Sequence, residues 1–497
     1  MSNTKASASA AAAAEEEKWG SKKLLQIREI PGSYGLPFVG PIADRLAYFY
    51  TQGQDEFFTS RMQKHQSTVF RANMPPGPFL ASDSGVIVLL DAKSFPVLFD
   101  VSKVEKKNVF AGTFMPSTSY TGGYRICSYL DPSEPKHALL KRFIFSILAS
   151  RHKRFIPEFS SSLSNDLFPL LEDQISRKGK ADFNTTSDSM SFNFVFRLFC
   201  DKNPSVTKIG SKGPTLIAKW LVFQLAPLFT LGLTKKFPNF LEDLLIHTFP
   251  LPPFLVKSDY KKLYDAFYES ATQILDEAEV MGLKRDEACH NLVFLSGFNT
   301  FGGMKTLFPS LFKWVGLAGE KLHQQLVREI RKVVKLEGGV VTLSAIEKME
   351  LTKSVVFEVL RIDPPVQFQY GKAKEDMVIE SHDAAFRVKE GEMIFGYQPL
   401  ATKDPKVFEN PEDFVGSRFV GEGEKLLKYV YWSNGRETES PTEENKQCPG
   451  KDFVVLVCRL MLIEFFLRYD TFTVDVKKSV LGSAVTVKSL TPANSGS

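Results

Sequence analysis

The sequence predicts a mainly α-helical protein with a smaller β-rich part. Helical patterns dominate from about residue 140 to residue 360, with a Pro-rich break at residues 249–253. Two earlier apolar runs, residues 69–74 and 86–90, are typical of strands, and the second is too uniformly apolar to be half exposed. Because no internal repeat or long linker divides the chain, we expect residues 27–497 to form one domain behind a disordered tail of residues 1–26.

The leader carries mixed signals about location. Residues 1–20 are rich in Ala and Ser, but they contain three glutamates in a row and no arginine, whereas a plastid transit peptide is rich in Arg and Ser and poor in acids. No run of about 20 apolar residues, the length of a transmembrane anchor, occurs in the sequence. We therefore expect a protein of the cytoplasm, or one peripheral on membranes or lipid bodies, with the plastid as an alternative.

Composition narrows the function classes. At 497 residues the chain is long enough to build a large cavity between two subdomains. The 43 phenylalanines suit an apolar pocket for a long acyl chain as well as a core. A net charge of +5, with Lys and Arg interspersed, is too mild to indicate a nucleic-acid partner. Weak contact with an anionic membrane surface is compatible with this charge.

The five cysteines are Cys127, Cys200, Cys289, Cys448 and Cys458. They are odd in number, widely spaced and without a C-x-x-C pair, which argues against a disulfide framework and against zinc. Cys448 differs from the others because lysines stand on either side of it and a glycine two residues on opens an apolar helix. Backbone dipoles and positive charge there favour a thiolate that ligates a metal. The alternative is a buried structural cysteine.

Other motifs stand in a fixed order before this cysteine. Glu358 and Arg361 lie one helical turn apart, and the segment 404–419 follows them. This order, ending in a Cys-Pro-Gly loop and an apolar helix, resembles the cytochrome P-450 fold, in which the cysteine is the axial ligand of haem. The resemblance implies that Cys448 binds the iron of haem b and that residues 432–452 form the haem-binding loop.

Candidate cations for the haem propionates come from an early loop and the helix after it. The Gly and Pro content of residues 103–135 predicts a loop, and His137 and Lys141 fall on one face of the following helix. With Lys106 from the loop and Lys446 beside the cysteine, these side chains offer suitable partners for the two propionates. The alternative is a solvated charged face.

An apolar helix over residues 291–305 has one polar step, Asn299-Thr300. Oxygen-activating P-450s carry an acid-Thr pair in this helix that delivers protons to bound dioxygen, and here asparagine stands in place of the acid. The alternative is an asparagine that only satisfies a neighbouring carbonyl. A polar insert, residues 437–444, precedes Cys448 and is expected to occupy the face where a reductase would dock.

Four motifs together resemble the plant fatty-acid hydroperoxide enzymes, namely allene oxide synthases, hydroperoxide lyases and divinyl ether synthases. The motifs are NTFGG at 299–303, YQP at 397–399, WSNG at 432–435 and NKQC at 445–448. These atypical P-450s need neither dioxygen nor a reductase, because a fatty-acid hydroperoxide brings its own oxygen. The resemblance covers nearly the whole chain and implies that Asn299 orients the peroxide while the Cys448 thiolate promotes cleavage of its O–O bond.

Family resemblance also bears on the product. An aromatic residue above the haem favours the synthase and a leucine favours the lyase, and this chain has Phe110 at that position. Thr300, where lyases more often have alanine, points the same way, whereas Cys448-Pro449-Gly450 and Gly297 resemble a subgroup in which lyases are common. We predict an allene oxide synthase acting through Asn299, Phe110 and Thr300, with a hydroperoxide lyase as the alternative.

Two further classes fit less well. A monooxygenase with a reductase is disfavoured by the Asn-Thr pair and by the polar insert before the cysteine. A haem sensor without catalysis has no need of a phenylalanine-lined pocket.

Overall fold

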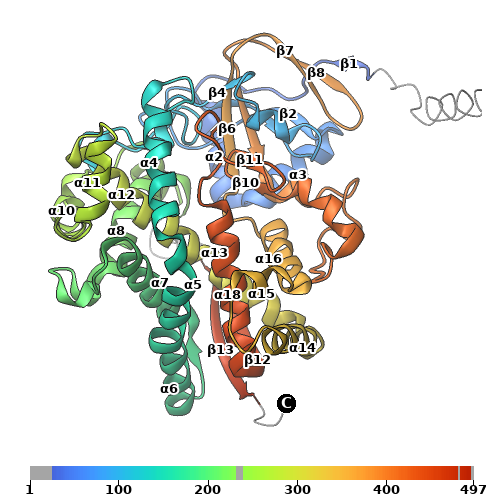
Figure 1. Cartoon of the computed structure of the whole chain (residues 1–497). Coiled ribbons are helices and arrows are strands. Elements are labelled where there is room, and N and C mark those ends of the chain that lie inside the picture. Colours follow the sequence, from blue (N-terminus) through green and yellow to red (C-terminus); the bar gives the residue numbers. More distant parts are fainter. Residues whose placement is uncertain (1–24, 231–238, 480–481, 494–497) are drawn as a thin grey trace, which may run out of the picture.

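A computed structural model of the chain describes residues 25–230, 239–479 and 482–493 (Figure 1). Nearly all of the tail predicted at residues 1–26 lies outside the described residues. The first described element, β1 (Ile27–Arg28), starts where the domain was expected to begin. The dominance of helices with a smaller β part confirms the predicted fold class.

Within the described residues the strands form four small sheets. A five-stranded sheet has the order β2-β3-β9-β6-β4, and smaller sheets have the orders β1-β8-β7, β12-β13-β5 and β10-β11. The remaining strand bounds are β2 (Val69–Asn73), β3 (Gly85–Leu89), β4 (Val104–Glu105), β5 (Ala181–Asp182), β6 (Phe368–Ala373), β7 (Met377–Glu380), β8 (Ala385–Val388), β9 (Met393–Tyr397), β10 (Tyr431–Trp432), β11 (Gly435–Arg436), β12 (Tyr469–Ser479) and β13 (Gly482–Pro492). Both strands predicted before residue 100 are thus confirmed as β2 and β3.

Strand β3 is buried on both faces, as its uniform apolar sequence predicted. Val86 and Val88 pack into one hydrophobic cluster, and Ile87 and Leu89 pack into a second one on the other face. All four side chains are at most 1% exposed. The strand also lies between β2 and β9, so its backbone is paired on both edges.

The helices occupy the rest of the fold. Their bounds are α2 (Val39–Leu46), α3 (Gln54–His65), α4 (Pro135–Arg151), α5 (Phe155–Ser162), α6 (Phe168–Lys178), α7 (Phe183–Cys200), α8 (Gly213–Leu225), α9 (Asn239–Glu242), α10 (Phe254–Ser270), α11 (Thr272–Val280), α12 (Arg285–Phe294), α13 (Gly302–Ala318), α14 (Glu320–Leu336), α15 (Leu343–Glu347), α16 (Glu350–Ile362), α17 (Gln398–Ala401) and α18 (Lys451–Arg468). The Pro-rich break separates a π-helical segment ending at Thr248 from α10.

Two helical runs contribute much of the core, and their segments α13 and α18 lie in the middle of the molecule (Figure 1). One consists of α12, the π-helix η12 (Leu295–Phe301) and α13, and the other is α18, which follows the cysteine loop. Most of their apolar side chains belong to the largest hydrophobic cluster or pack against it. The five-stranded sheet lies at one end of this helical body, and the β12–β13 hairpin packs beside α13 and α18 at the other (Figure 1).

Candidate active site

The two adjacent polar residues Asn299 and Thr300 lie within the π-helix η12. Thr300 is buried, and its Oγ1 donates a hydrogen bond to the carbonyl oxygen of Leu295, 2.9 Å away. Asn299 is exposed although Gly297 and Thr300 beside it are buried, and within the described residues its side chain makes no hydrogen bond. Short π-helical segments are frequent at functional sites because they displace side chains from the regular helix face. The alternative in which Asn299 only satisfies a nearby carbonyl therefore finds no support in the hydrogen bonding.

The early loop brings Phe110 against this helix. The rings of Phe110 and Phe298 meet edge to face with centroids 5.9 Å apart, and Tyr129 packs against Phe110 at 6.0 Å. Phe298 in turn stacks on Phe294 at 4.5 Å. The fold thus packs Phe110, the aromatic residue singled out in the sequence, against Phe298, which immediately precedes Asn299.

The cysteine loop is shaped by backbone and glutamine contacts. The Cys448 backbone N–H donates to the Ser433 carbonyl at 3.1 Å, and α18 begins three residues later. Gln398 Nε2 donates to the Tyr431 carbonyl at 2.7 Å, and Gln369 Nε2 donates to the Trp432 carbonyl at 2.8 Å. Sequence reasoning missed Gln369; its one signal is a polar residue within a largely buried strand.

Two opposing effects act on the Cys448 thiol. Burial raises its pKa above the usual value, whereas a hydrogen bond from the Gly450 backbone and the charges of Lys141 and Lys451 lower it. Burial outweighs the other influences, so the local dipoles and charges do not by themselves produce the thiolate that the sequence predicted. Coordination to a metal cation would supply the missing stabilisation, because metal coordination deprotonates a thiol.

Three of the predicted cations already bond to backbone carbonyls. Lys106 Nζ donates to the Tyr370 carbonyl at 2.5 Å, and Lys141 Nζ donates to both the carbonyl and the side-chain oxygen of Asn445, at 2.5 and 3.0 Å. Lys446 Nζ donates to the carbonyls of residues 127, 128 and 130. The Lys141 and Lys446 bonds join α4 and the early loop to the cysteine loop, and the Lys106 bond joins the early loop to β6.

The four predicted cations also influence one another. Burial lowers the pKa of Lys106 to about 7, of Lys141 and Lys446 to about 8, and of His137 to about 4. Lys446 adds to the lowering for each of the other three, while Asp131 opposes it for Lys106, His137 and Lys446. His137 is therefore neutral near pH 7 and offers only an N–H, whereas the three lysines form a buried group with little opposing negative charge. Such a group fits an anionic ligand such as the two propionates of a haem.

The polar insert packs on the helices that flank the cysteine loop. Trp432 Nε1 donates to the Glu437 carboxylate at 2.5 Å, and Lys451 Nζ donates to the Glu437 carbonyl at 3.0 Å. Glu443 forms an ion pair with Arg142 of α4 at 2.7 Å. The insert is therefore tied into the fold at both of its ends.

The predicted Glu358–Arg361 pair forms a buried ion-pair cluster. Arg361 Nε lies 2.7 Å from the Glu358 carboxylate, and both side chains are fully buried. Arg418 contacts the same carboxylate at 2.9 Å, and the Val415 backbone N–H donates to it at 2.9 Å. The ion-pair cluster fixes the segment that leads to the cysteine loop.

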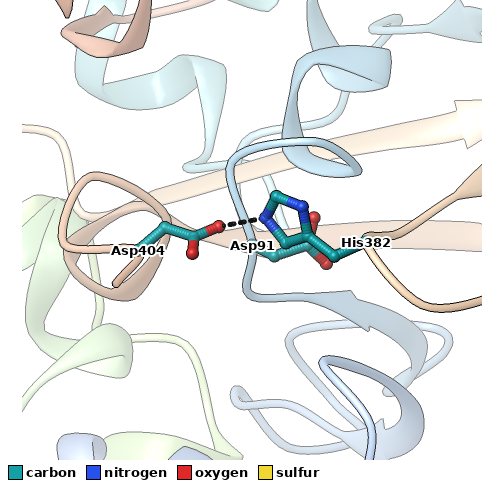
Figure 2. A group of neighbouring side chains, drawn as sticks. All are labelled: Asp91, His382 and Asp404. Atoms are coloured by element: carbon teal, nitrogen blue, oxygen red, sulfur yellow. Dashed lines mark hydrogen bonds and ion pairs between the residues drawn. The ribbon is translucent and has the colours of Figure 1, made fainter. Parts of the chain in front are cut away.

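A second cluster of possible metal ligands lies away from the cysteine. Figure 2 shows His382 pointing at Asp404, with 2.6 Å between Nε2 and the carboxylate, and Asp91 beside them. Both carboxylates already accept protein hydrogen bonds, Asp404 from the Ala92 backbone and Asp91 from Thr68. We interpret this cluster as a structural link between the large sheet and the β7–β8 hairpin.

Comparison with known proteins gives consistent matches. A family model described as Cytochrome P450 matches residues 300–489. The chain is 61% identical to allene oxide synthase 1, chloroplastic, of Solanum lycopersicum, over 95% of this chain and 87% of that protein. It is 60% identical to the chloroplastic allene oxide synthase of Arabidopsis thaliana, over 96% of this chain and 91% of that protein. It is 57% identical to allene oxide synthase 3 of Solanum lycopersicum over the full length of both chains.

These names contradict the predicted location. Two of the three relatives are named chloroplastic, so the prediction of a protein in the cytoplasm or on lipid bodies is wrong. That prediction depended on the glutamates of the leader, a compositional argument about residues outside the described part of the chain. Among the helices that the structure describes, none is long and apolar enough to cross a bilayer.

Proposed function

The chain belongs to the allene oxide synthase family of cytochromes P450, and on that premise we propose which of its residues carry out the dehydration of a fatty-acid hydroperoxide to an allene oxide. Cytochromes P450 hold haem through a cysteine thiolate, and we assign that ligand to Cys448 and the cofactor to haem b. The observation that carries the proposal is Asn299, an exposed amide in a largely buried helix, next in sequence to the Phe298 ring that packs on Phe110.

When bound, the haem supplies an open iron position and the one-electron chemistry that cleaves an O–O bond. The chain's own contribution is Asn299, whose amide would donate a hydrogen bond to the peroxide and fix its orientation. In an apolar surrounding that contact contributes roughly 1–3 kcal/mol. The amide also cannot act as the proton-delivering acid that oxygen activation requires.

Phe110 and Phe298 are proposed to exclude water from the reacting carbon chain. Their edge-to-face packing leaves part of the Phe110 ring accessible to the substrate. An aromatic face stabilises a neighbouring electron-poor centre, whether the carbon radical or the cation that follows it, and so favours proton loss over chain cleavage.

Thr300 is proposed to act by positioning Asn299. Its hydroxyl donates to the carbonyl five residues earlier, a spacing that belongs to the π-helical turn. A side chain that holds this turn determines where the amide of Asn299 points. The lysines and His137 are proposed to receive the propionates, because they form a buried group with little opposing negative charge. For Lys446 this requires the exchange of one of its three carbonyl bonds for a propionate oxygen.

We propose that the reaction proceeds without a reductase. The substrate already holds oxygen at the peroxide level, and Asn299 replaces the acid that reductive oxygen activation uses. The insert adds support, since its ion pair between Glu443 and Arg142 covers part of the surface beside the cysteine loop.

A peripheral contact with a membrane surface is proposed as the route to lipid substrates. Phe38 and Phe79 are 76% and 67% exposed, and Phe79 stacks on Phe249 at 4.9 Å. An ion pair between Arg45 and Asp243, at 2.7 Å, holds α2 against the segment that contains Asp243. Flotation with galactolipid vesicles tests the contact: serine at positions 38 and 79 is expected to release the protein from the vesicles, and unchanged flotation would refute it.

The names of the relatives support a plastid location for this chain. Fractionation of plant cells that express the full chain with a C-terminal tag tests this proposal. Tag recovered in washed chloroplasts supports it, whereas tag confined to the soluble fraction outside organelles refutes it.

Product identification tests the reaction itself. Purified holoenzyme, with ferric haem and no reductase, is given the 9- and 13-hydroperoxides of linolenic acid separately, and the products are separated by gas chromatography and mass spectrometry. The expected products of an allene oxide in water are ketols, formed by hydrolysis, and a racemic cyclopentenone, formed by cyclisation. Short-chain aldehydes with matching oxo-acids would show a lyase instead, and a requirement for reductase and dioxygen would refute the reductase-free reaction.

A further inference from the structure

A buried tyrosine and histidine form a hydrogen-bonded pair outside the proposed catalytic residues. The Tyr260 hydroxyl of α10 and Nδ1 of His290 in α12 are 2.7 Å apart, and the two residues are 7% and 6% exposed. With the imidazole proton on Nε2, Nδ1 accepts the phenol hydrogen and Nε2 faces Asp286 at 3.5 Å. This arrangement gives a phenol a proton acceptor and gives the resulting imidazolium a carboxylate partner.

Packed aromatic rings connect this pair to the active site. Trp220 is fully buried and stacks on Tyr260, with 5.3 Å between centroids and 21° between the planes. Trp220 also meets Phe294 edge to face at 5.9 Å, and Phe294 stacks on Phe298 at 4.5 Å. Because Phe298 precedes Asn299 in the chain, the row runs from the proposed peroxide site to Tyr260.

The row continues from the pair toward solvent. His290 stacks on Tyr264 with 4.5 Å between centroids, and Tyr264 stacks on Tyr268 at 5.5 Å. Tyr268 is 37% exposed. An electron supplied at the surface therefore has oxidisable side chains on its way inward.

A second buried tyrosine, Tyr129, has no histidine bonded to its hydroxyl in the described part of the chain and serves as a comparison for Tyr260. Tyr129 lies against Phe110 and Phe294, at 6.0 and 5.8 Å, and so is in contact with the residues proposed to line the active site. Its hydroxyl has no hydrogen-bond partner within the described residues. Loss of an electron from this phenol would leave a proton in an apolar surrounding with nothing to accept it, which is costly. Tyr260 has the acceptor that Tyr129 lacks.

We propose that Tyr260 and His290 form a redox-active pair. The pair removes an oxidising equivalent that is left at the active site when the O–O bond has been cleaved but the dehydration is not completed. The proposal rests on the proposed function, which supplies the oxidant. In a completed dehydration the substrate carbon radical returns its electron, and no oxidising equivalent remains. If the alkoxyl radical instead takes a hydrogen atom from a C–H bond of a second lipid molecule and departs as an alcohol, that lipid carries one radical away and one oxidising equivalent stays behind at the active site.

Reduction of this oxidising equivalent and recovery of the pair take two steps, in which the electrons and protons balance. Tyr260 gives up one electron through Trp220, its O–H bond breaks, and the proton forms an N–H bond at Nδ1 of His290, which leaves a neutral tyrosyl radical beside an imidazolium. A one-electron reductant in solution, such as ascorbate, returns an electron from the Tyr268 side. His290 gives the proton back, and both side chains regain their starting states.

Freeze-quenched electron paramagnetic resonance tests the pair in the haem-loaded full chain. Cumene hydroperoxide is the oxidant, because it has no double bond onto which its alkoxyl radical can close. We expect a radical signal that narrows when the chain carries ring-deuterated tyrosine. Tyr260→Phe keeps the ring stacked on Trp220 and should lose most of this signal, and His290→Gln should lower it, whereas the matched variant Tyr129→Phe should retain it.

A second readout follows the stability of the cofactor. Under repeated additions of cumene hydroperoxide, the haem absorbance should decay faster in Tyr260→Phe than in the wild type or in Tyr129→Phe, and ascorbate should protect the wild type more. A signal that persists in Tyr260→Phe and disappears in Tyr129→Phe would overturn the proposal, as would the absence of any tyrosine radical.

The two proposals fail in distinguishable ways. Ketols from a fatty-acid hydroperoxide without a tyrosine radical would leave the synthase reaction in place and refute the redox pair. A radical at Tyr260 in a holoenzyme that yields aldehydes in place of ketols would support the pair and refute the synthase reaction.

Discussion

Replacing Glu358 by glutamine should weaken the fold that supports the cysteine loop. The Glu358 carboxylate accepts hydrogen bonds from Arg361 at 2.7 and 2.8 Å and from Arg418 at 2.9 and 3.0 Å. The Glu358 and Arg361 side chains are fully buried, and that of Arg418 is 8% exposed. Glutamine keeps the shape of the side chain but removes the negative charge that two guanidinium groups share.

The expected loss is large for a single substitution. Removing one partner from a buried ion pair costs about 3–5 kcal/mol, because the remaining charge stays buried without compensation. An exposed pair is the natural control: Lys389 and Asp376 lie 2.6 Å apart with side chains 69% and 60% exposed. Asp376→Asn should change the free energy of unfolding by at most about 1 kcal/mol.

Equilibrium urea unfolding, followed by circular dichroism, measures both variants under the same conditions. Glu358→Gln should have a lower urea midpoint than Asp376→Asn. It should also release haem at a lower urea concentration, since the ion-pair cluster holds the segment before the cysteine loop. A midpoint equal to that of Asp376→Asn would refute the reasoning. It would mean that carbonyl contacts alone satisfy the buried Arg361, which also donates to the Pro411 carbonyl at 2.7 Å.

Three further variants probe the active site and the pH dependence of stability. Asn299→Leu should lower kcat/KM for the hydroperoxide about ten- to a hundredfold by removing a hydrogen bond of roughly 1–3 kcal/mol; a rate like that of the wild type would exclude a catalytic role. Phe110→Leu should shift products from ketols toward aldehydes in the chromatographic assay, and an unchanged ratio would exclude Phe110 as a product determinant. Burial lowers the pKa of His247 to about 4, so the unfolded chain holds an extra proton between pH 4 and pH 6.5 and stability falls as the pH drops through that window. His247→Gln should reduce this pH slope by at most about 1.4 kcal/mol per pH unit in urea midpoints measured across the window, and an unchanged slope would refute the assignment.

Local sequence was enough to predict several parts of the molecule. The uniform apolar run of β3 predicted a strand buried on both faces, and the spacing of Glu358 and Arg361 predicted a pair on one helix face. Both inferences concern neighbours within a few residues, where the repeat of a strand or helix dictates which side chains share a face. The order of motifs around Cys448 likewise indicated the family.

Other parts of the site were outside the reach of local patterns. The π-helical turn that occupies the hydroxyl of Thr300 and leaves Asn299 exposed has no signature in the sequence around it. The leader composition pointed to the wrong compartment, because a single compositional rule about acidic residues does not determine targeting.

The sequence by itself determined the fold class, the buried strand, the Glu358–Arg361 pair and the family, since each depends on residues close together or on an ordered set of motifs. Only the tertiary structure decided that Phe110 packs on Phe298, and that Tyr260 has His290 as its proton acceptor. These partners lie on separate elements, and the packing of whole helices and loops against one another sets the distance between them.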